Sequence, residues 1–203
     1  MGLAFETERR AEPRLGLIVL QADETIENEL RRIIPSHATL HVSRVPCGRD
    51  VTTDSLSEME NHIGHSAKLF PSSISFETVG YGCTSGTSVI GIERVADLVR
   101  SGTSARAVSA LIAACRHLRV TRLAFLSPYI EDVSFTMRSV LAANGIETPV
   151  FGSFEVSEEA VVARISPASI LQAAVQLADN SEAEAIFISC TNLRTLDVIS
   201  AIE

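Results

Sequence analysis

Short apolar segments alternate with amphipathic stretches along almost the whole chain, and this alternation limits the possible folds more than any other feature. Five apolar runs are expected to be buried strands: Leu15–Leu20, Thr39–Val45, Ser75–Tyr81, Arg122–Ser127 and Ala185–Ser189. Helices are expected at Glu24–Ile34, Asp54–Leu69, Ser88–Arg100, Ser104–Leu118, Glu131–Asn144 and Pro167–Asn180. This order predicts an α/β fold with mostly parallel sheets, in which ligands bind beyond the carboxyl ends of the strands.

Two of the expected strand ends are alike. The segments VGYGCTS (Val79–Ser85) and FISCTN (Phe187–Asn192) each lead from a strand into a Cys-Thr pair, with a helix expected to follow. They lie about half the chain length apart. The simplest interpretation is two pseudo-symmetric α/β halves, residues 1–100 and 101–203, each presenting a cysteine to a site in the cleft between them.

Cys83 and Cys190 are therefore the candidate catalytic residues. We expect the N-terminus of the following helix to lower the pKa of each thiol and to favour the thiolate. Polar side chains after the two cysteines are suited to holding a carboxylate: Thr84, Ser85, Thr191 and Asn192. Two opposed thiols can invert a carbon centre by removing a proton from one face and delivering one to the other. Alternatively, one thiol can add to a polarised double bond and permit rotation before it leaves.

Composition and motifs argue against several classes of protein. The chain has 17 basic and 25 acidic residues, a net charge of −8, and its basic residues are scattered, so no nucleic-acid partner is expected. No segment approaches the roughly 18 apolar residues of a membrane span, and the charged start predicts a cytoplasmic protein. The four cysteines form no CxxC pair, and there is no GxGxxG turn, Walker loop or His-rich spacing. Neither a cofactor nor a metal is expected.

Four segments carry a resemblance to a known family: GYGCTSGT around Cys83, LSPY at Leu126–Tyr129, VARISP at Val162–Pro167 and ISCTNLRTLDVI at Ile188–Ile199. From about Leu15 onward the chain resembles the aspartate/glutamate/hydantoin racemase superfamily. It is most similar to the branch that holds maleate cis-trans isomerase, arylmalonate decarboxylase and the racemase-like proteins of ectoine utilisation. The resemblance implies a cofactor-independent protein with two pseudo-symmetric α/β halves that enclose the site.

The same resemblance implies residue roles. Cys83 and Cys190 match the paired catalytic cysteines, and the presence of Cys83 favours an isomerase or racemase over a decarboxylase. Four residues match positions that hold a substrate carboxylate: Thr84, Ser85, Tyr129 and Thr191. The wording SCTNLRTLDVI is most like the ectoine-utilisation group.

Three features depart from the family pattern. Glu158 and Glu159 stand where maleate isomerases carry a substrate-binding Asn, and an acidic residue there is expected to repel a dicarboxylate. Residues 99–104 are expected to join two helices directly, where relatives have a short strand. The family continues with a further strand and helix beyond the position of Glu203, so this C-terminal segment is expected to be absent.

The first hypothesis is thus a cofactor-independent racemase or cis-trans isomerase of a small carboxylate, either an amino acid or a dicarboxylate. A carboxylate-binding or regulatory relative without turnover, a decarboxylase of a malonate-type substrate and a redox-sensing thiol pair are the alternatives. A homo-oligomer is one option for the assembly.

Other conspicuous residues are given structural interpretations. Cys115 lies on the apolar side of its expected helix and is assigned to the core. Cys47 is assigned to a loop or packing role, with a position near the pocket left open. His62 and His65 share a helical face without a partner at metal spacing, so a solvated face is expected.

Overall fold

The computed structural model describes residues 1–8, 11–103, 106–107, 110–179 and 182–203. Its strands are β1 (Arg14–Leu20), β2 (Thr39–Val45), β3 (Thr78–Gly82), β4 (Arg106–Ala107), β5 (Arg122–Tyr129), β6 (Glu147–Val156) and β7 (Ala185–Ile188). Its helices are α1 (Ile26–Ile33), α2 (Thr53–Glu58), α3 (Glu60–Lys68), α4 (Thr84–Ile90), α5 (Ile92–Gly102), α6 (Ala110–Leu118), α7 (Glu131–Ala143), α8 (Glu159–Val162), α9 (Pro167–Ala178) and α10 (Ile199–Ile202). The predicted helix ends Ser104 and Asn180 fall outside the described residues.

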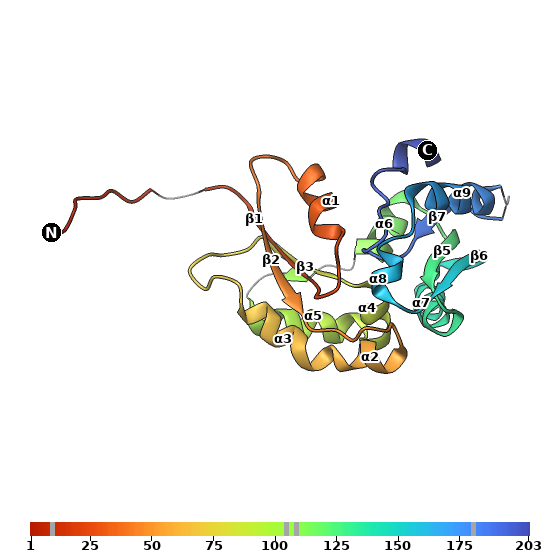
Figure 1. Ribbon diagram of the computed structural model, residues 1–203, viewed down its shortest axis with the longest axis horizontal. Helices are drawn as coiled ribbons and strands as arrows, with labels where there is room; N and C mark the ends of the chain where they lie inside the picture. The colour runs from red at the N-terminus through yellow and green to blue at the C-terminus, as the bar shows by residue number, and fades with distance from the viewer. Residues whose placement is uncertain (9–10, 104–105, 108–109, 180–181) are drawn as a thin grey trace.

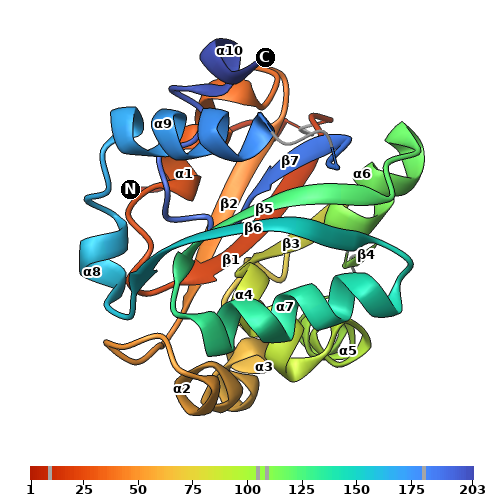
Figure 2. The same ribbon diagram turned by 90° about the vertical axis from the view of Figure 1, so that its right-hand side faces the viewer.

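The strands form two parallel sheets, as predicted. The first has the order β2-β1-β3-β4 and the second the order β6-β5-β7. Each sheet is built around a central strand whose neighbours follow it in the same sequence order, so β1, β2 and β3 correspond to β5, β6 and β7. Figure 1 shows the two sheets side by side, and Figure 2 shows β5 and β6 in front of β1 and β2. The chain is therefore an α/β protein of two pseudo-symmetric halves.

Helices cover the sheets on both sides. In the second half, α7 and α9 lie on opposite faces of the sheet formed by β5, β6 and β7 (Figure 2). In the first half, α3 and α5 pack together and cover one face, while α1 lies on the other side (Figure 1). This layering leaves the carboxyl ends of β3 and β7 turned toward the junction of the halves.

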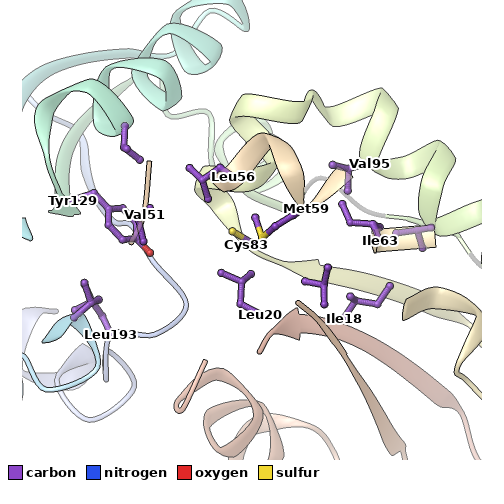
Figure 3. Packing of buried hydrophobic residues seen from close by; sticks show 14 of the residues in the cluster. Ile18, Leu20, Val51, Leu56, Met59, Ile63, Cys83, Val95, Tyr129 and Leu193 are labelled. Atoms are coloured by element: carbon purple, nitrogen blue, oxygen red, sulfur yellow. The ribbon is translucent and has the colours of Figure 1, made fainter. Parts of the chain in front are cut away.

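The core crosses that junction. One apolar cluster includes Ile18 and Ile63 from the first half together with Tyr129 and Leu193 from the second. Figure 3 shows Cys83 in this same cluster. A second, smaller cluster lies within the second half and contains Cys115, which confirms its assignment to the core. The shared cluster fixes how the two halves face each other, because close-packed interiors resist sliding.

Two predicted single helices are each divided in two. The region predicted as one helix over Ser88–Arg100 contains α4 and α5, separated by Gly91 at a φ of 102°. That backbone conformation is outside the helical region and favours glycine. The prediction over Asp54–Leu69 was wrong in the same way, because the N–H of Met59 bonds to the Ser57 carbonyl and interrupts the regular helical ladder.

The direct connection predicted for residues 99–104 was also wrong. After α5, the short strand β4 pairs with Thr78 and Val79 of β3 and extends the first sheet. A strand of two residues is too short to show a periodic pattern, so the sequence carried no usable signal for it. Among the described helices, none combines the length and apolar character needed to cross a membrane.

Candidate active site

Cys83 lies where β3 passes into α4. Its backbone is extended, with a φ of −152°, and its Sγ accepts a hydrogen bond of 3.2 Å from the N–H of Gly86 in the first turn of α4. The cysteine thus occupies the N-cap position, which Ser, Thr, Asp and Asn usually fill. The side chain is buried in the apolar cluster. The predicted position at a strand end is confirmed.

Cys190 follows β7 at the equivalent end of the second sheet. Its φ of 87° is unusual for a residue with a side chain. Its Sγ lies 3.3 Å from the N–H of Asn192 and 2.9 Å from the hydroxyl oxygen of Tyr129. The helix expected directly after Cys190 is not there: a turn follows, and α10 begins only at Ile199. This turn bonds to the other half of the molecule, which explains why it is not helical.

Two residues of the Cys190 loop, Thr191 and Asn192, link it to the loop between β1 and α1. The Asn192 side-chain oxygen accepts the N–H of Glu24 at 2.8 Å, and the Asn192 carbonyl accepts the Thr25 hydroxyl at 3.0 Å. The Thr191 hydroxyl lies 2.8 Å from a carboxylate oxygen of Asp23 and 3.1 Å from the Gly82 carbonyl. These bonds hold the end of β7 against the end of β3.

Glu159, at the start of α8, joins the groups around Cys190. One carboxylate oxygen accepts the Tyr129 hydroxyl at 2.7 Å, and the other accepts the Asn192 side-chain amide at 2.9 Å. Glu159 is only 4% exposed. Each oxygen accepts a hydrogen bond from a neutral side chain. These two bonds orient Tyr129 and Asn192 in the unliganded protein.

A cavity of about 670 Å³ lies between the two halves and reaches the site from the side of Cys83. Cys83, Thr84 and Thr191 are part of its wall, whereas Cys190 is not. Farther from the thiols, the wall is apolar and includes Leu111, Met137 and Phe187. Ser85 is buried within the first turn of α4. The structure therefore brings the predicted residues to one junction, with Thr84 and Thr191 on the open side.

The predicted lowering of the thiol pKa values was wrong. Burial raises the pKa of Cys83 to about 12, and the N–H of Gly86 offsets this only in part. Burial also raises the pKa of Cys190 well above its usual value, and the negative charge of Glu159 raises it further. Desolvation of a thiolate in an apolar cluster outweighs one backbone donor. Both thiols are therefore protonated at neutral pH in the unliganded protein.

Three further residues belong to the site, although the sequence did not single them out as functional. The hydroxyl of Tyr81 lies beside Cys83, which follows it by two residues at the end of β3. The period-two alternation of an extended chain could have shown that both side chains point to the same side. Asp23 comes from the loop after β1. Cys47 accepts hydrogen bonds from backbone N–H groups of that loop, and burial, with the charges of Glu159 and Asp23 as smaller causes, raises its pKa. Cys47 therefore lies near Glu159 and Asp23, although it is not part of the cavity wall.

The histidines do not contribute to this site. His62 and His65 are exposed on α3, as predicted. Within the described ranges, no group of three or more His, Cys, Asp and Glu side chains is arranged to hold a metal ion.

Comparison with known proteins gives a consistent result. A family model described as arylmalonate decarboxylase matches residues 16–203. The chain is 25% identical to the maleate isomerase of Geobacillus stearothermophilus over 210 residues, which cover 94% of this chain and 82% of the relative. It is 27% identical to the maleate isomerase of Nocardia farcinica over 192 residues, which cover 87% and 75% of the two chains.

Solved structures show the same fold. The maleate isomerase Iso from Pseudomonas putida S16 superposes with a TM-score of 0.84 at 22% identity, over 95% of this chain and 84% of that chain. An arylmalonate decarboxylase structure superposes with a TM-score of 0.70 at 20% identity, over 94% and 83%.

The family match and the maleate isomerase relatives, together with two facing α/β halves, place the chain in the aspartate/glutamate racemase-like class. Within that class, the chain belongs to the arylmalonate decarboxylase family. The predicted superfamily branch is confirmed.

Proposed function

We propose that this protein is a cofactor-independent isomerase of a small carboxylate, a racemase or a cis-trans isomerase, with Cys83 and Cys190 as the catalytic residues. The carrying observation is that the two thiols occupy equivalent strand ends of the two halves and share Glu159 as a charged neighbour. The identity to maleate isomerases supports an isomerase.

The arrangement suits two chemical routes. In the first, one sulfur as thiolate takes the proton from the carbon next to the substrate carboxylate, and the other thiol gives its proton to the opposite face. In the second, one sulfur as thiolate forms a C–S bond at one carbon of a polarised double bond while the other thiol protonates the other carbon. The resulting single bond rotates, and the reverse loss of the proton and of the thiolate restores the double bond. One solved relative, a variant of the Nocardia farcinica maleate cis-trans isomerase, has a covalently bound succinylcysteine intermediate, which supports the second route.

Substrate binding is assigned to the polar groups near the thiols. Thr84 and Thr191 line the cavity and are placed to receive the carboxylate, while Ser85 supports the first turn of α4. Tyr129 and Asn192 are also assigned to substrate binding. Both donate hydrogen bonds to Glu159, and both lie beside the Cys190 sulfur.

The wider context is part of the same proposal. The motif SCTNLRTLDVI supports a role in ectoine utilisation, and the acidic composition and motif content support a cytoplasmic protein, with a homo-oligomer as the expected assembly. The division into halves at residues 1–100 and 101–203 is also proposed. β4 follows this boundary in the sequence but pairs with β3 of the first sheet.

The test is exchange with solvent. The protein is incubated in D2O with maleate and with a panel of short amino acids, and deuterium at the carbon next to the carboxylate is followed by NMR together with isomer formation. We expect both Cys83→Ser and Cys190→Ser to lose turnover by at least about a hundredfold. The matched control is Cys115→Ala, which changes a cysteine that lies in the separate core cluster. Full activity in either serine variant would end the two-thiol proposal.

A carboxylate-binding protein without turnover is the second candidate, because burial keeps both thiols protonated in the unliganded state. Ligand-induced stabilisation without any exchange or isomer formation would favour it.

A further inference from the structure

Glu159 is a buried carboxylate that lacks a positive partner. Its two oxygens accept hydrogen bonds from Tyr129 and Asn192, which are both neutral. In the part of the chain that the structure describes, no ion pair includes Glu159. A carboxylate removed from water and held only by neutral donors is costly unless a cation comes to it.

Asp23 shows how this molecule compensates a buried carboxylate that has a structural role. One oxygen of Asp23 accepts the backbone N–H groups of Thr25 and Ile26 at the start of α1, both at 2.9 Å. Burial raises the pKa of Asp23, and these two N–H groups, together with the Thr191 hydroxyl and the positive charge of Arg44, offset part of that rise. Glu159 accepts hydrogen bonds from two neutral side chains instead, and no basic side chain pairs with it among the described residues.

Glu159 is linked to Cys190 through Tyr129, and its charge also acts on Cys83. The Tyr129 hydroxyl donates a hydrogen bond to Glu159, and its oxygen is 2.9 Å from Sγ of Cys190. The charge of Glu159 raises the pKa of Cys83, on the other half of the molecule. A molecule that contacts the Cys190 sulfur beside the Tyr129 hydroxyl would therefore be a neighbour of this carboxylate.

We propose that the small carboxylate bound between Cys83 and Cys190 also carries an ammonium group, which pairs with Glu159. This inference rests on the proposed function and narrows its substrate class to short zwitterionic amino acids. A second carboxylate in the same place would face Glu159 in a low-dielectric setting, where like charges repel strongly.

A bound ammonium group would also activate the thiols. Burial is the main cause of the raised pKa of Cys83 and Cys190, and the negative charge of Glu159 adds to it. A cation beside Glu159 cancels this added contribution, so thiolate forms more readily when the correct ligand is present. Binding and activation are then coupled through one carboxylate.

The test compares two ligands that differ only at one end: β-alanine, with an ammonium group, and succinate, with a carboxylate in its place. Each is titrated at constant ionic strength into the full chain, and the ligand-induced rise in Tm gives an apparent Kd. Protection of Cys83 and Cys190 against iodoacetamide, read by peptide mass spectrometry, shows whether the ligand sits at the thiols.

We expect β-alanine to bind the wild-type chain at least about tenfold more tightly than succinate, and Glu159→Gln to abolish or reverse this preference. The matched control is Glu158→Gln, which removes an adjacent carboxylate that pairs with Arg49 at the surface; it should behave like wild type.

Three results would overturn the inference: equal or tighter binding of succinate by the wild type, an unchanged preference in Glu159→Gln, or no binding of either ligand. The first leaves the proposed function intact, because succinate that protects the thiols still marks a carboxylate site between them. Failure of the proposed function is detected separately, as full exchange activity in either Cys→Ser variant.

Discussion

The hydroxyl oxygen of Tyr129 lies 2.9 Å from Sγ of Cys190 and, at the same time, donates its only proton to Glu159 at 2.7 Å. An ionised carboxylate can only accept, so the Tyr129 proton is committed to it. The contact with sulfur must then use the thiol proton of Cys190, donated to the tyrosine oxygen. This explains in hydrogen-bond terms why Cys190 is a thiol in the unliganded protein.

Tyr129→Phe tests this contact. The variant removes the acceptor of the Cys190 proton and one donor to buried Glu159, so we expect a loss of about 1–3 kcal/mol in the free energy of unfolding. Turnover in the exchange assay should fall by about a hundredfold. Urea denaturation and the exchange rate are the measurements. Unchanged values for both would show that the Tyr129 hydroxyl has no role in the site.

The pH dependence of stability should reveal Glu159. Burial raises the pKa of its carboxyl, so Glu159 takes up a proton more readily in the folded state than in the unfolded state. Its stabilising contribution is fully present below the ordinary glutamate pKa of about 4.3 and is lost as the pH rises through the higher folded value. Glu159→Gln is neutral throughout and should lose less stability than wild type as the pH rises above the ordinary glutamate pKa of about 4.3.

The measurement for this prediction is the free energy of unfolding from urea titrations at each pH. Glu158→Gln is the control, because its side chain is paired with Arg49 and partly exposed. Parallel curves for wild type and Glu159→Gln would contradict the prediction.

Thiol alkylation should be slow at neutral pH. Since burial raises the pKa of Cys83 to about 12, the rate of its reaction with iodoacetamide should keep rising up to the highest pH at which the protein stays folded. The rate at each pH is obtained by peptide mass spectrometry, with half-buried Cys47 as the internal comparison. A plateau near the ordinary thiol pKa of about 8.5 would contradict the burial argument.

Gly86→Ala should disturb the Cys83 side of the site. A Cβ at this position would lie 2.7 Å from Cε of Met59, 3.0 Å from Sγ of Cys83 and 3.2 Å from the Tyr81 hydroxyl. We expect a loss of about 1–3 kcal/mol in stability, together with reduced turnover, because the thiol must shift.

Gly80→Ala is the matched control for that substitution, since its nearest neighbour would be a Leu17 methyl carbon at an ordinary 3.8 Å. Comparable losses in both variants would mean that the effect is a general one on β3 and not specific to the thiol.

Much of the fold was predictable because its signals are local. The runs that form β1, β2, β5 and β7 are apolar and bounded by polar or turn residues, and α9 begins at the predicted Ser166-Pro167 signal. β6 was missed, because its sequence ETPVFGSFEV includes Pro149 and Gly152 and alternates poorly. It is a strand because β5 supplies a hydrogen-bonding edge along nearly its whole length.

The candidate site was predictable in part for the same reason. The repeated strand and Cys-Thr pattern marked Cys83 and Cys190, and the structure places both at strand ends. The sequence could not show that Glu159 lies beside Tyr129 and Asn192, since these three residues come from α8, the end of β5 and the loop after β7. Their proximity results from the packing of α8 against the end of the second sheet and across to the first half.

From its sequence alone, this chain was expected to alternate strands and helices, to form two similar halves and to carry a cysteine in each, because those properties depend on residue patterns a few positions long. The protonation of the two thiols and the unpaired charge of Glu159 depend on the assembled molecule. They arise from burial and from neighbours that are distant along the chain, and the cost of removing a charge from water exists only once the two halves have closed around it.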